Sequence, residues 1–232
     1  MSRNIIAIAG LKNSGKTEVA NMLDYLLNSP AFFHNYWCYK HLPKLFKRWH
    51  KIAFADTLKQ MLASLLNVDI CKFEDREFKE NTDIELSTLK FFKNPVRLGD
   101  RNFVKLLQTE DTLKDYSLTV RQLMQYFGTE ICQKYFGKNV WINTVLNNPK
   151  NLIIGDLRFK AEAKAVKNKN GKLIYVYRPG IQPGNHASEK EVIDLLNDKE
   201  FDFIIKNDSS LKVLFYKIKN LIYDNQYFNL KE

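Results

Sequence analysis

The feature that most constrains this chain is an apolar run followed at once by a glycine-rich loop that contains a lysine. The run Ile5–Ala9 is compact and apolar, which is typical of a strand buried on both faces of a parallel sheet. The loop Gly10–Thr17 matches G-x-x-x-x-G-K-[ST] without a departure, and apolar residues recur at helical spacing from Val19 to Leu27. A strand before this motif and a helix after it are the context of a phosphate-binding loop.

The residue types of the loop suit a polyanionic ligand. Glycines let the backbone wrap around phosphates, and exposed amides at the start of a helix face negative charge. Lys16 is expected to reach the β- and γ-phosphates of a nucleotide, and Thr17 is expected to offer its hydroxyl to Mg²⁺. The loop residues predicted to bind the nucleotide are Gly10, Lys12, Asn13, Ser14, Gly15, Lys16 and Thr17.

The rest of the chain alternates predicted strands with predicted helices. Strands are expected at Lys51–Ala55, Leu152–Ile154, Leu173–Tyr177 and Phe201–Ile205, and helices at Leu58–Leu66, Val120–Tyr135, Ala161–Lys169, Val192–Leu196 and Leu211–Leu221. This order predicts an α/β fold, with a mainly parallel sheet and helices on both of its faces. Residues 68–116 are polar and charged. They are expected to form a helical or loop-rich insertion, or a lid lobe, within one P-loop domain of residues 1–232.

Local signals predict where some of these helices begin, end or break. Ser188 and Glu191 stand in capping-box spacing ahead of an apolar stripe. Ser209 is expected to cap the last helix. Gly128 is expected to interrupt the helix that starts near Val120.

A phosphate-binding loop needs an acidic group for its metal. Asp156 follows the strand Leu152–Ile154, at the end of the sheet where ligands of open α/β folds gather, so we expect it to hold Mg²⁺ together with Thr17. The alternative is that Asp156 caps the helix that follows it. Arg158 lies on the same rim and is expected to clamp a phosphate, with an ordinary surface arginine as the alternative.

Composition excludes some classes of protein and leaves others open. The net charge of +10 favours anionic partners without choosing among them. No run approaches the ~18 apolar residues of a membrane span. The three cysteines are odd in number and far apart, which predicts reduced thiols and a cytoplasmic protein. The N-K-x-D pattern of GTPases is missing, and the length of 232 residues disfavours a large motor ATPase. A small phosphoryl-transfer enzyme or a regulatory nucleotide-binding protein remains.

Four blocks of sequence, taken together, carry a resemblance to one family. The blocks are Gly10–Thr17, Phe54–Lys59, Arg121–Glu130, and Asp156–Glu162 with Tyr177–Gly180 and His186–Glu189. In this order they resemble the deoxynucleoside monophosphate kinases of bacteriophages and other large DNA viruses, within the P-loop nucleoside-monophosphate kinase superfamily. The resemblance implies Mg-ATP as phosphate donor, a deoxynucleoside 5′-monophosphate (dNMP) as acceptor, dNDP and ADP as products, and the host cytoplasm as location.

The resemblance also implies roles for individual residues. Lys16, Arg121 and Arg158 are the expected catalytic cations, and Arg178 joins the loop residues in binding ATP. The acceptor is expected to contact Asp56 and Lys59, which stand at matching positions of the second block, and Arg121 of the third. Arg76 and Lys79 are added as further cations that could neutralise phosphate charge, and a solvated surface charge is the alternative for each of these cations. The D-R-[YH] element of thymidylate kinases is absent after the core strands, and residues 31–51 and 81–116 match no block of the family.

Two other functions remain as alternatives. Phosphomevalonate-kinase-type enzymes share a similar loop, an A/G-x-x-x-L-K element and a D-x-R strand end. Residues 34–51 interleave aromatic and basic side chains, as some single-stranded nucleic-acid binders do. We favour a packed loop there, since no known nucleic-acid fold surrounds it. Neither a membrane nor a nucleic acid is an expected partner, and a homodimer is left open.

Overall fold

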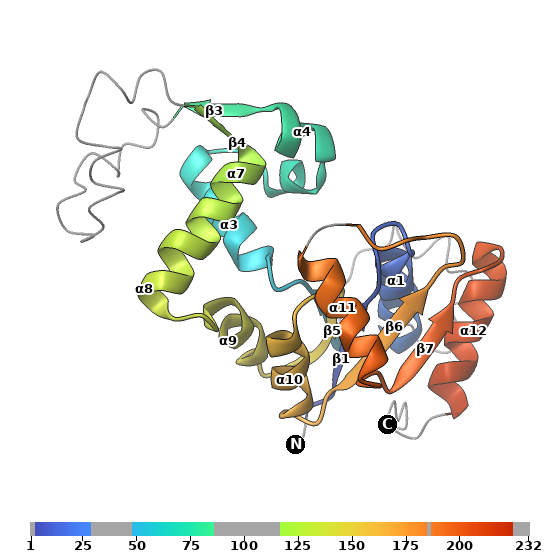
Figure 1. Cartoon of the computed structure of the whole chain (residues 1–232). Coiled ribbons are helices and arrows are strands. Elements are labelled where there is room, and N and C mark those ends of the chain that lie inside the picture. The colour runs from blue at the N-terminus through green and yellow to red at the C-terminus, as the bar shows by residue number, and fades with distance from the viewer. Residues whose placement is uncertain (1–2, 29–47, 86–116, 185–186, 225–232) are drawn as a thin grey trace. The chain divides into compact units, whose positions relative to one another are not determined.

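The computed structural model describes residues 3–28, 48–84, 118–184 and 187–224, together with the backbone of residues 85 and 117. They form two compact units (Figure 1), one of Met1–Phe54 with Ile142–Glu232 and the other of Ala55–Trp141. The predictions made for residues 31–47 and 86–116 lie outside the described residues. The single kinase domain with an insertion at 68–116 therefore stays a prediction.

The first unit is built on a parallel sheet of five strands in the order β2-β5-β1-β6-β7. The strands are β1 (Ile5–Ala9), β2 (Trp49–Ile52), β5 (Asn151–Ile154), β6 (Lys172–Tyr177) and β7 (Phe203–Lys206). Every neighbouring pair is parallel. Each residue of β1 is fully buried, because this strand lies in the middle of the sheet with both faces covered. The predicted α/β fold with a mainly parallel sheet is confirmed.

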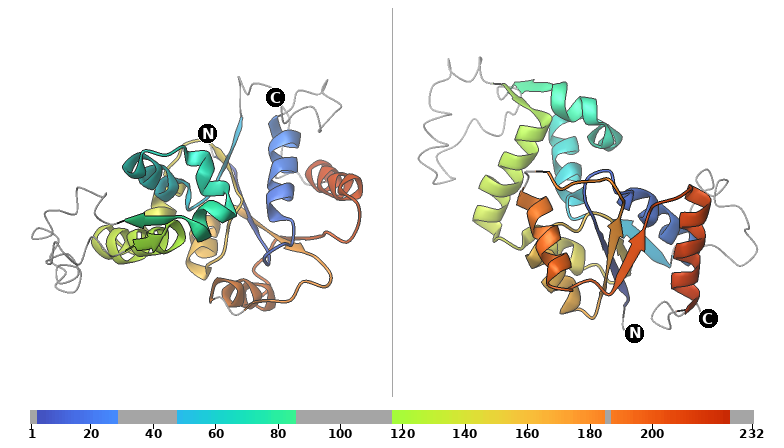
Figure 2. Two further views of the ribbon diagram at one scale, coloured as in Figure 1. Left: turned by 90° about the horizontal axis from the view of Figure 1, so that it is seen from above. Right: turned by 45° about the vertical axis from the view of Figure 1, so that its right-hand side comes forward.

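Helices cover both faces of this sheet. They are α1 (Lys16–Asn28), α9 (Val140–Leu146), α10 (Lys160–Lys167), α11 (Ala187–Asn197) and α12 (Leu211–Asp224). Alternate residues of β1 point to opposite faces: Ile6 and Ile8 pack with α1 and α12, which lie side by side (Figure 2). Ile5, Ala7 and Ala9 pack instead with apolar side chains of α9, α10 and α11.

The second unit is mainly helical and has a core of its own. Its elements are α3 (Asp56–Leu66), η1 (Ile70–Glu74), α4 (Arg76–Asn81), β3 (Asp83–Glu85), β4 (Ser117–Thr119), α7 (Val120–Gln125), the π-helical segment η5 (Tyr126–Gln133) and α8 (Lys134–Phe136). Strands β3 and β4 pair antiparallel. Leu62, Phe73 and Leu123 are among its largest buried side chains.

Gly128 does not interrupt its helix as the sequence predicted. The helix continues through it as the π-helical segment η5, and Gly128 is buried. A Cβ atom added there would lie 3.0 Å from Cδ2 of Leu58, so the glycine permits close packing against α3. The Trp141 indole N–H also donates to the Gly128 carbonyl oxygen, at 3.1 Å.

Several predicted boundaries and caps are also wrong. Strand β2 ends at Ile52, where its pairing with Ile154 of β5 ends, rather than at Ala55. Helix α11 begins at Ala187, so Ser188 lies inside the helix rather than at its N-cap, and the Glu191 carboxylate accepts the Lys160 N–H. The last helix is capped one residue later than expected, since the Ser210 hydroxyl accepts the Val213 N–H while the Ser209 hydroxyl donates to Asp208.

Two sequence predictions concern membranes and thiols. Among the described residues, none of the helices is both long and apolar enough to cross a membrane. Cys71 and Cys132 are free thiols, the first exposed and the second buried, and Cys38 lies outside the described residues.

Candidate active site

The phosphate loop Gly10–Thr17 connects the end of β1 to the start of α1. A Cβ atom at Gly10 would lie 2.6 Å from the Val176 carbonyl oxygen, so only glycine fits against β6. Gly15 has a φ of +95° and leaves room for Asn207, whose Nδ2 would lie 2.4 Å from a Cβ at that position. Helix α1 begins at Lys16, and the backbone N–H groups of its first turn give this end of the loop a positive potential.

Lys16 lies over the loop rather than out in solvent. Its Nζ donates to the carbonyl oxygens of Gly10, at 2.7 Å, and Leu11, at 2.6 Å. Burial, helped by repulsion from Arg158, lowers the pKa of Lys16 from 10.5 to about 8, although Glu189 and Asp156 attract the cation. The structure thus brings Lys16, Asp156 and Arg158 together at the carboxyl ends of β1 and β5.

Asp156 is not the helix cap that the sequence left as an alternative. One oxygen of its carboxylate accepts the Phe54 N–H at 2.8 Å, and the N-cap of α10 is Phe159. Glu162 caps this end of the helix instead, because its Oε2 accepts the N–H groups of Arg158 at 2.7 Å and Phe159 at 3.0 Å. Glu162 therefore fixes the backbone of Arg158. It is the last residue of the block Asp156–Glu162, and no role was predicted for it from the sequence.

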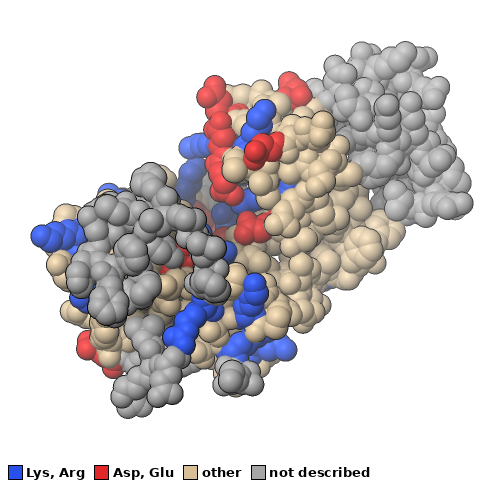
Figure 3. Space-filling model, turned by 180° about the vertical axis from the view of Figure 1, so that it is seen from behind, with Lys and Arg blue, Asp and Glu red and all other residues tan. Residues whose placement is uncertain are grey.

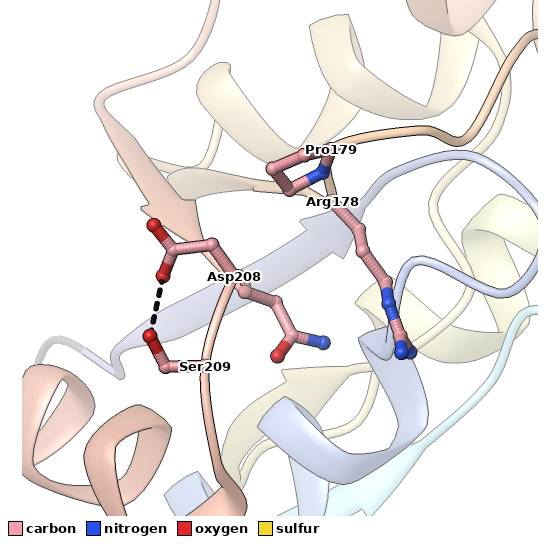
Figure 4. A pocket seen from close by; sticks show the side chains of 5 residues that line it. Arg178, Pro179, Asp208 and Ser209 are labelled. Atoms are coloured by element: carbon pink, nitrogen blue, oxygen red, sulfur yellow. Dashed lines mark hydrogen bonds between the residues drawn. The ribbon is translucent and has the colours of Figure 1, made fainter.

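A cavity of about 240 Å³ lies where β6 and β7 end. It is lined by Arg178, Pro179, Asn207, Asp208 and Ser209 (Figure 4). Asn207 is buried, and its Nδ2 donates to the Ser14 carbonyl oxygen at 2.9 Å, so the cavity borders the phosphate loop. Asp208 accepts hydrogen bonds from Lys217 and Ser209. Sequence reasoning found Arg178 but missed Asn207, whose place directly after a strand was the available signal.

The residues predicted to bind the acceptor lie together in the second unit. Lys59 of α3 pairs with Glu74, at 2.7 Å, and with Asp56, at 3.4 Å. Burial lowers the pKa of Lys59, but the hydrogen bond and attraction of Glu74, with those of Asp56, outweigh it, so the net shift is upward.

The other three predicted cations lie on α4 and α7. Arg121 and Arg76 both approach Glu80, at 3.0 Å and 3.6 Å. The pKa of Lys79 is lowered, first by burial and then by repulsion from Lys59 and Arg121. Lys59, Lys79 and Arg121 are therefore close enough to repel one another. Figure 3 shows acidic and basic side chains interleaved on one face of the molecule. Glu74 and Glu80 were missed because nothing in the sequence distinguishes them from other surface carboxylates.

Comparison with known proteins decides the family. The model of a family described as deoxynucleotide monophosphate kinase matches residues 91–218, more than half of the chain. The chain belongs to this family. It is 25% identical over 232 residues to a protein of Acanthamoeba polyphaga mimivirus provisionally named a deoxynucleotide monophosphate kinase, covering 92% of this chain and 93% of the relative. It is 29% identical over 132 residues to the deoxynucleotide monophosphate kinase of Enterobacteria phage T4, covering 52% and 53%.

Among solved structures, dephospho-CoA kinase from Campylobacter jejuni matches with a TM-score of 0.41 and 14% identity, covering 97% of this chain and 98% of that one. The resemblance noted in the sequence is confirmed by the family match. As a deoxynucleotide monophosphate kinase family member, the chain is a nucleotide kinase, a phosphotransferase for which the family implies ATP as donor. The phosphate loop of this kinase lies outside the matched range 91–218, so loop and family match are separate observations.

Proposed function

We propose that this kinase transfers the γ-phosphate of ATP to a deoxynucleoside 5′-monophosphate, producing dNDP and ADP. The observation that carries the proposal is the phosphate loop, with Lys16, Asp156 and Arg158 gathered beside it, in a member of this family. Lys16 and Arg158 supply positive charge where phosphate charge would shift during transfer. The acceptor's phosphate oxygen is already a nucleophile, so the reaction needs alignment and charge neutralisation rather than a strong general base.

The donor's phosphates would lie against the loop Gly10–Thr17 and its base beside the cavity at Arg178. Support for this comes from Asn207, which both lines the cavity and binds the backbone of the loop. The Arg178 guanidinium offers a flat cation on which a purine ring can stack. One continuous surface of the first unit would then bind the base, the sugar and the phosphates of ATP.

Thr17 and Asp156 are the residues proposed to hold Mg²⁺. Their hydroxyl and carboxylate oxygens are the ligands that this ion prefers, and Mg²⁺ in kinases is usually bound by one or two protein groups together with the substrate's phosphates. The described residues contain no group of three or more His, Cys, Asp or Glu that could hold a metal ion. When bound, Mg²⁺ would offset the negative charge on the phosphates.

The acceptor would bind the cluster formed by Asp56, Lys59, Arg76, Lys79 and Arg121. Its support is the set of ion pairs around Glu74 and Glu80, because a dianionic phosphate can take the place of these carboxylates and pair with the same cations. Arg121 is proposed as catalytic as well, since a guanidinium can hold a phosphate through two parallel hydrogen bonds.

A coupled ADP-release assay tests the function directly. The four dNMPs, the matching rNMPs and phosphomevalonate are offered one at a time with ATP and Mg²⁺. We expect turnover with one or more dNMPs and a kcat/KM above that of the matching rNMP by roughly 5- to 150-fold, as a hydroxyl excluded by shape is worth 1–3 kcal/mol. Turnover with phosphomevalonate alone would favour the other kinase class. Single-stranded DNA binding at physiological salt, without dNMP turnover, would favour a nucleic-acid-binding protein.

Asp156→Asn tests the metal site. The side-chain oxygen of Asn can still accept the Phe54 N–H, so we expect the melting temperature to change by no more than a few degrees. The lost charge should raise the Mg²⁺ concentration needed for half-maximal turnover by at least about 10- to 100-fold, the range seen when groups that only orient a metal's ligands are changed. A large drop in melting temperature with an unchanged Mg²⁺ titration would instead assign Asp156 a structural role.

A further inference from the structure

The Glu189 side chain connects two segments of the first unit that lie far apart in the sequence. One oxygen of its carboxylate accepts the N–H of Lys12 in the phosphate loop, at 2.9 Å. The other accepts the N–H of Gly184. Gly184 ends the segment Arg178–Gly184, called the strap here, whose first two residues line the cavity next to the loop. A single side chain therefore ties the strap to the phosphate loop.

The charge of Glu189 suits this contact. Burial raises the pKa of the carboxyl, but the two N–H donors and the cations Lys16 and Lys12 outweigh it, and the pKa lies below its ordinary value. Hydrogen bonds to an ionised acceptor are about twice as strong as those between neutral groups. Both bonds are therefore of the stronger kind at neutral pH.

The position of the contact within the loop suggests what it does. Lys12 precedes the helix, so the carboxylate takes none of the backbone N–H groups in the first turn of α1, which begins at Lys16. The Nζ of Lys16 donates to the carbonyl oxygens of Gly10 and Leu11, the two residues that precede Lys12. Glu189 thus holds the phosphate loop at Lys12 and does not take the N–H groups of the first turn of α1.

We propose that Glu189 is a positioning residue for the donor nucleotide, which holds the phosphate loop and the strap in the relative arrangement that ATP or ADP requires. The inference rests on the proposed function only in taking an adenine nucleotide as the donor. Glu189 contacts neither the reacting atoms nor the acceptor cluster in this role. It acts through the backbone of Lys12 on the phosphate side and through the strap on the side of Arg178.

Helix α11 offers a matched control at Glu191. This carboxylate lies two residues further along the same helix and also accepts a backbone N–H, that of Lys160, at 2.8 Å. Glu191→Gln therefore makes the same chemical change on the same helix, at a contact that does not include the phosphate loop. A change in ADP binding that is seen in the Glu189 variants but not in Glu191→Gln is therefore due to the contact with the phosphate loop and the strap.

The experiment measures ADP binding by calorimetry, with no acceptor present, for the wild type, Glu189→Gln, Glu189→Asp and Glu191→Gln. A glutamine can accept only one of the two N–H groups, so we expect Glu189→Gln to bind ADP about tenfold more weakly. Glu189→Asp keeps the charge but is one methylene shorter, and should also bind more weakly. Glu191→Gln should stay within twofold of the wild type. Faster amide exchange at Lys12 and Gly184 should accompany the loss only in the Glu189 variants.

Three results would overturn the proposal. Unchanged ADP affinity in both Glu189 variants, with faster exchange at Lys12 and Gly184, would show a contact that stabilises the fold without positioning the nucleotide. Tighter binding of ADP by Glu189→Gln would show that the carboxylate competes with phosphate. A wild type that binds no ADP would also refute it, whereas one that binds ADP but phosphorylates no dNMP refutes only the proposed function.

Discussion

Lys16→Ala is expected to lower phosphoryl-transfer turnover by roughly a thousandfold, the effect of removing a preorganised group that meets developing charge. The ammonium lies over the phosphate loop, bound to the carbonyl oxygens of Gly10 and Leu11. Its burial and the nearby Arg158 lower its pKa to about 8, so holding this cation there has a cost in the free energy of folding. The alanine variant should therefore melt at the same temperature as the wild type or higher.

The measurement pairs steady-state kinetics with thermal melting of the same preparations. Lys212→Ala is the control, because this lysine is exposed on α12, and it should leave both turnover and melting temperature unchanged. Near wild-type turnover in a folded Lys16→Ala protein would contradict the assignment of Gly10–Thr17 as the catalytic phosphate loop. Loss of turnover together with a collapse in melting temperature would mean that Lys16 holds the loop together instead.

The parts of the site that could be predicted are those determined by residues adjacent in the sequence or by the topology of the sheet. The strand Ile5–Ala9, the glycines of the loop and the helix after it follow one another directly, so their spacing alone indicates their arrangement. Asp156 and Arg158 could be placed beside them because the ends of parallel strands share one edge of a sheet. Each of these inferences needed only local structure and the topology of the sheet.

The missed residues have in common that they act across long stretches of sequence. Asn207 binds Ser14 from 193 positions away, and Glu189 binds Lys12 from 177 positions away. Both make their bond to a backbone atom, which leaves no paired side chain in the sequence to find. Gly128 was misjudged for a related reason, since its packing against Leu58 is a tertiary contact that overrides the local tendency of glycine to end a helix.

Glu162 provides the second large effect, on stability and its dependence on pH. The side chain is only 8% exposed and accepts the N–H groups of Arg158 and Phe159. Burial, with repulsion from Asp156, outweighs these donors and Arg158, and raises the pKa from 4.5 to about 7. The folded state thus holds this proton more tightly than the unfolded chain does. The resulting stabilisation is fully present below pH 4.5 and is lost as the pH rises through about 7.

Replacing Glu162 by glutamine should remove this dependence. In the wild type, the ionisation is expected to lower the free energy of unfolding by about 3 kcal/mol between pH 4.5 and pH 7, since each unit of pKa shift corresponds to 1.36 kcal/mol. Glutamine keeps an oxygen for the two N–H groups and carries no charge, so Glu162→Gln should be more stable than the wild type above pH 7. Glu162→Ala leaves both N–H groups without this acceptor and should be about 2–5 kcal/mol less stable than the wild type at pH 5. This difference should shrink as the pH rises, because only the wild type has the carboxyl that ionises.

Urea unfolding of the wild type and the three variants Glu162→Gln, Glu162→Ala and Glu191→Gln at pH 5, 6, 7 and 8 measures these differences. Glu191→Gln should keep the wild-type slope, because it leaves the carboxyl of Glu162 in place. A Glu162→Gln protein with the same slope as the wild type would show that Glu162 is ionised throughout this range and that its two N–H donors outweigh its burial. Because Glu162 holds the backbone of Arg158, the alanine variant should also lose turnover, while the glutamine variant should retain most of it.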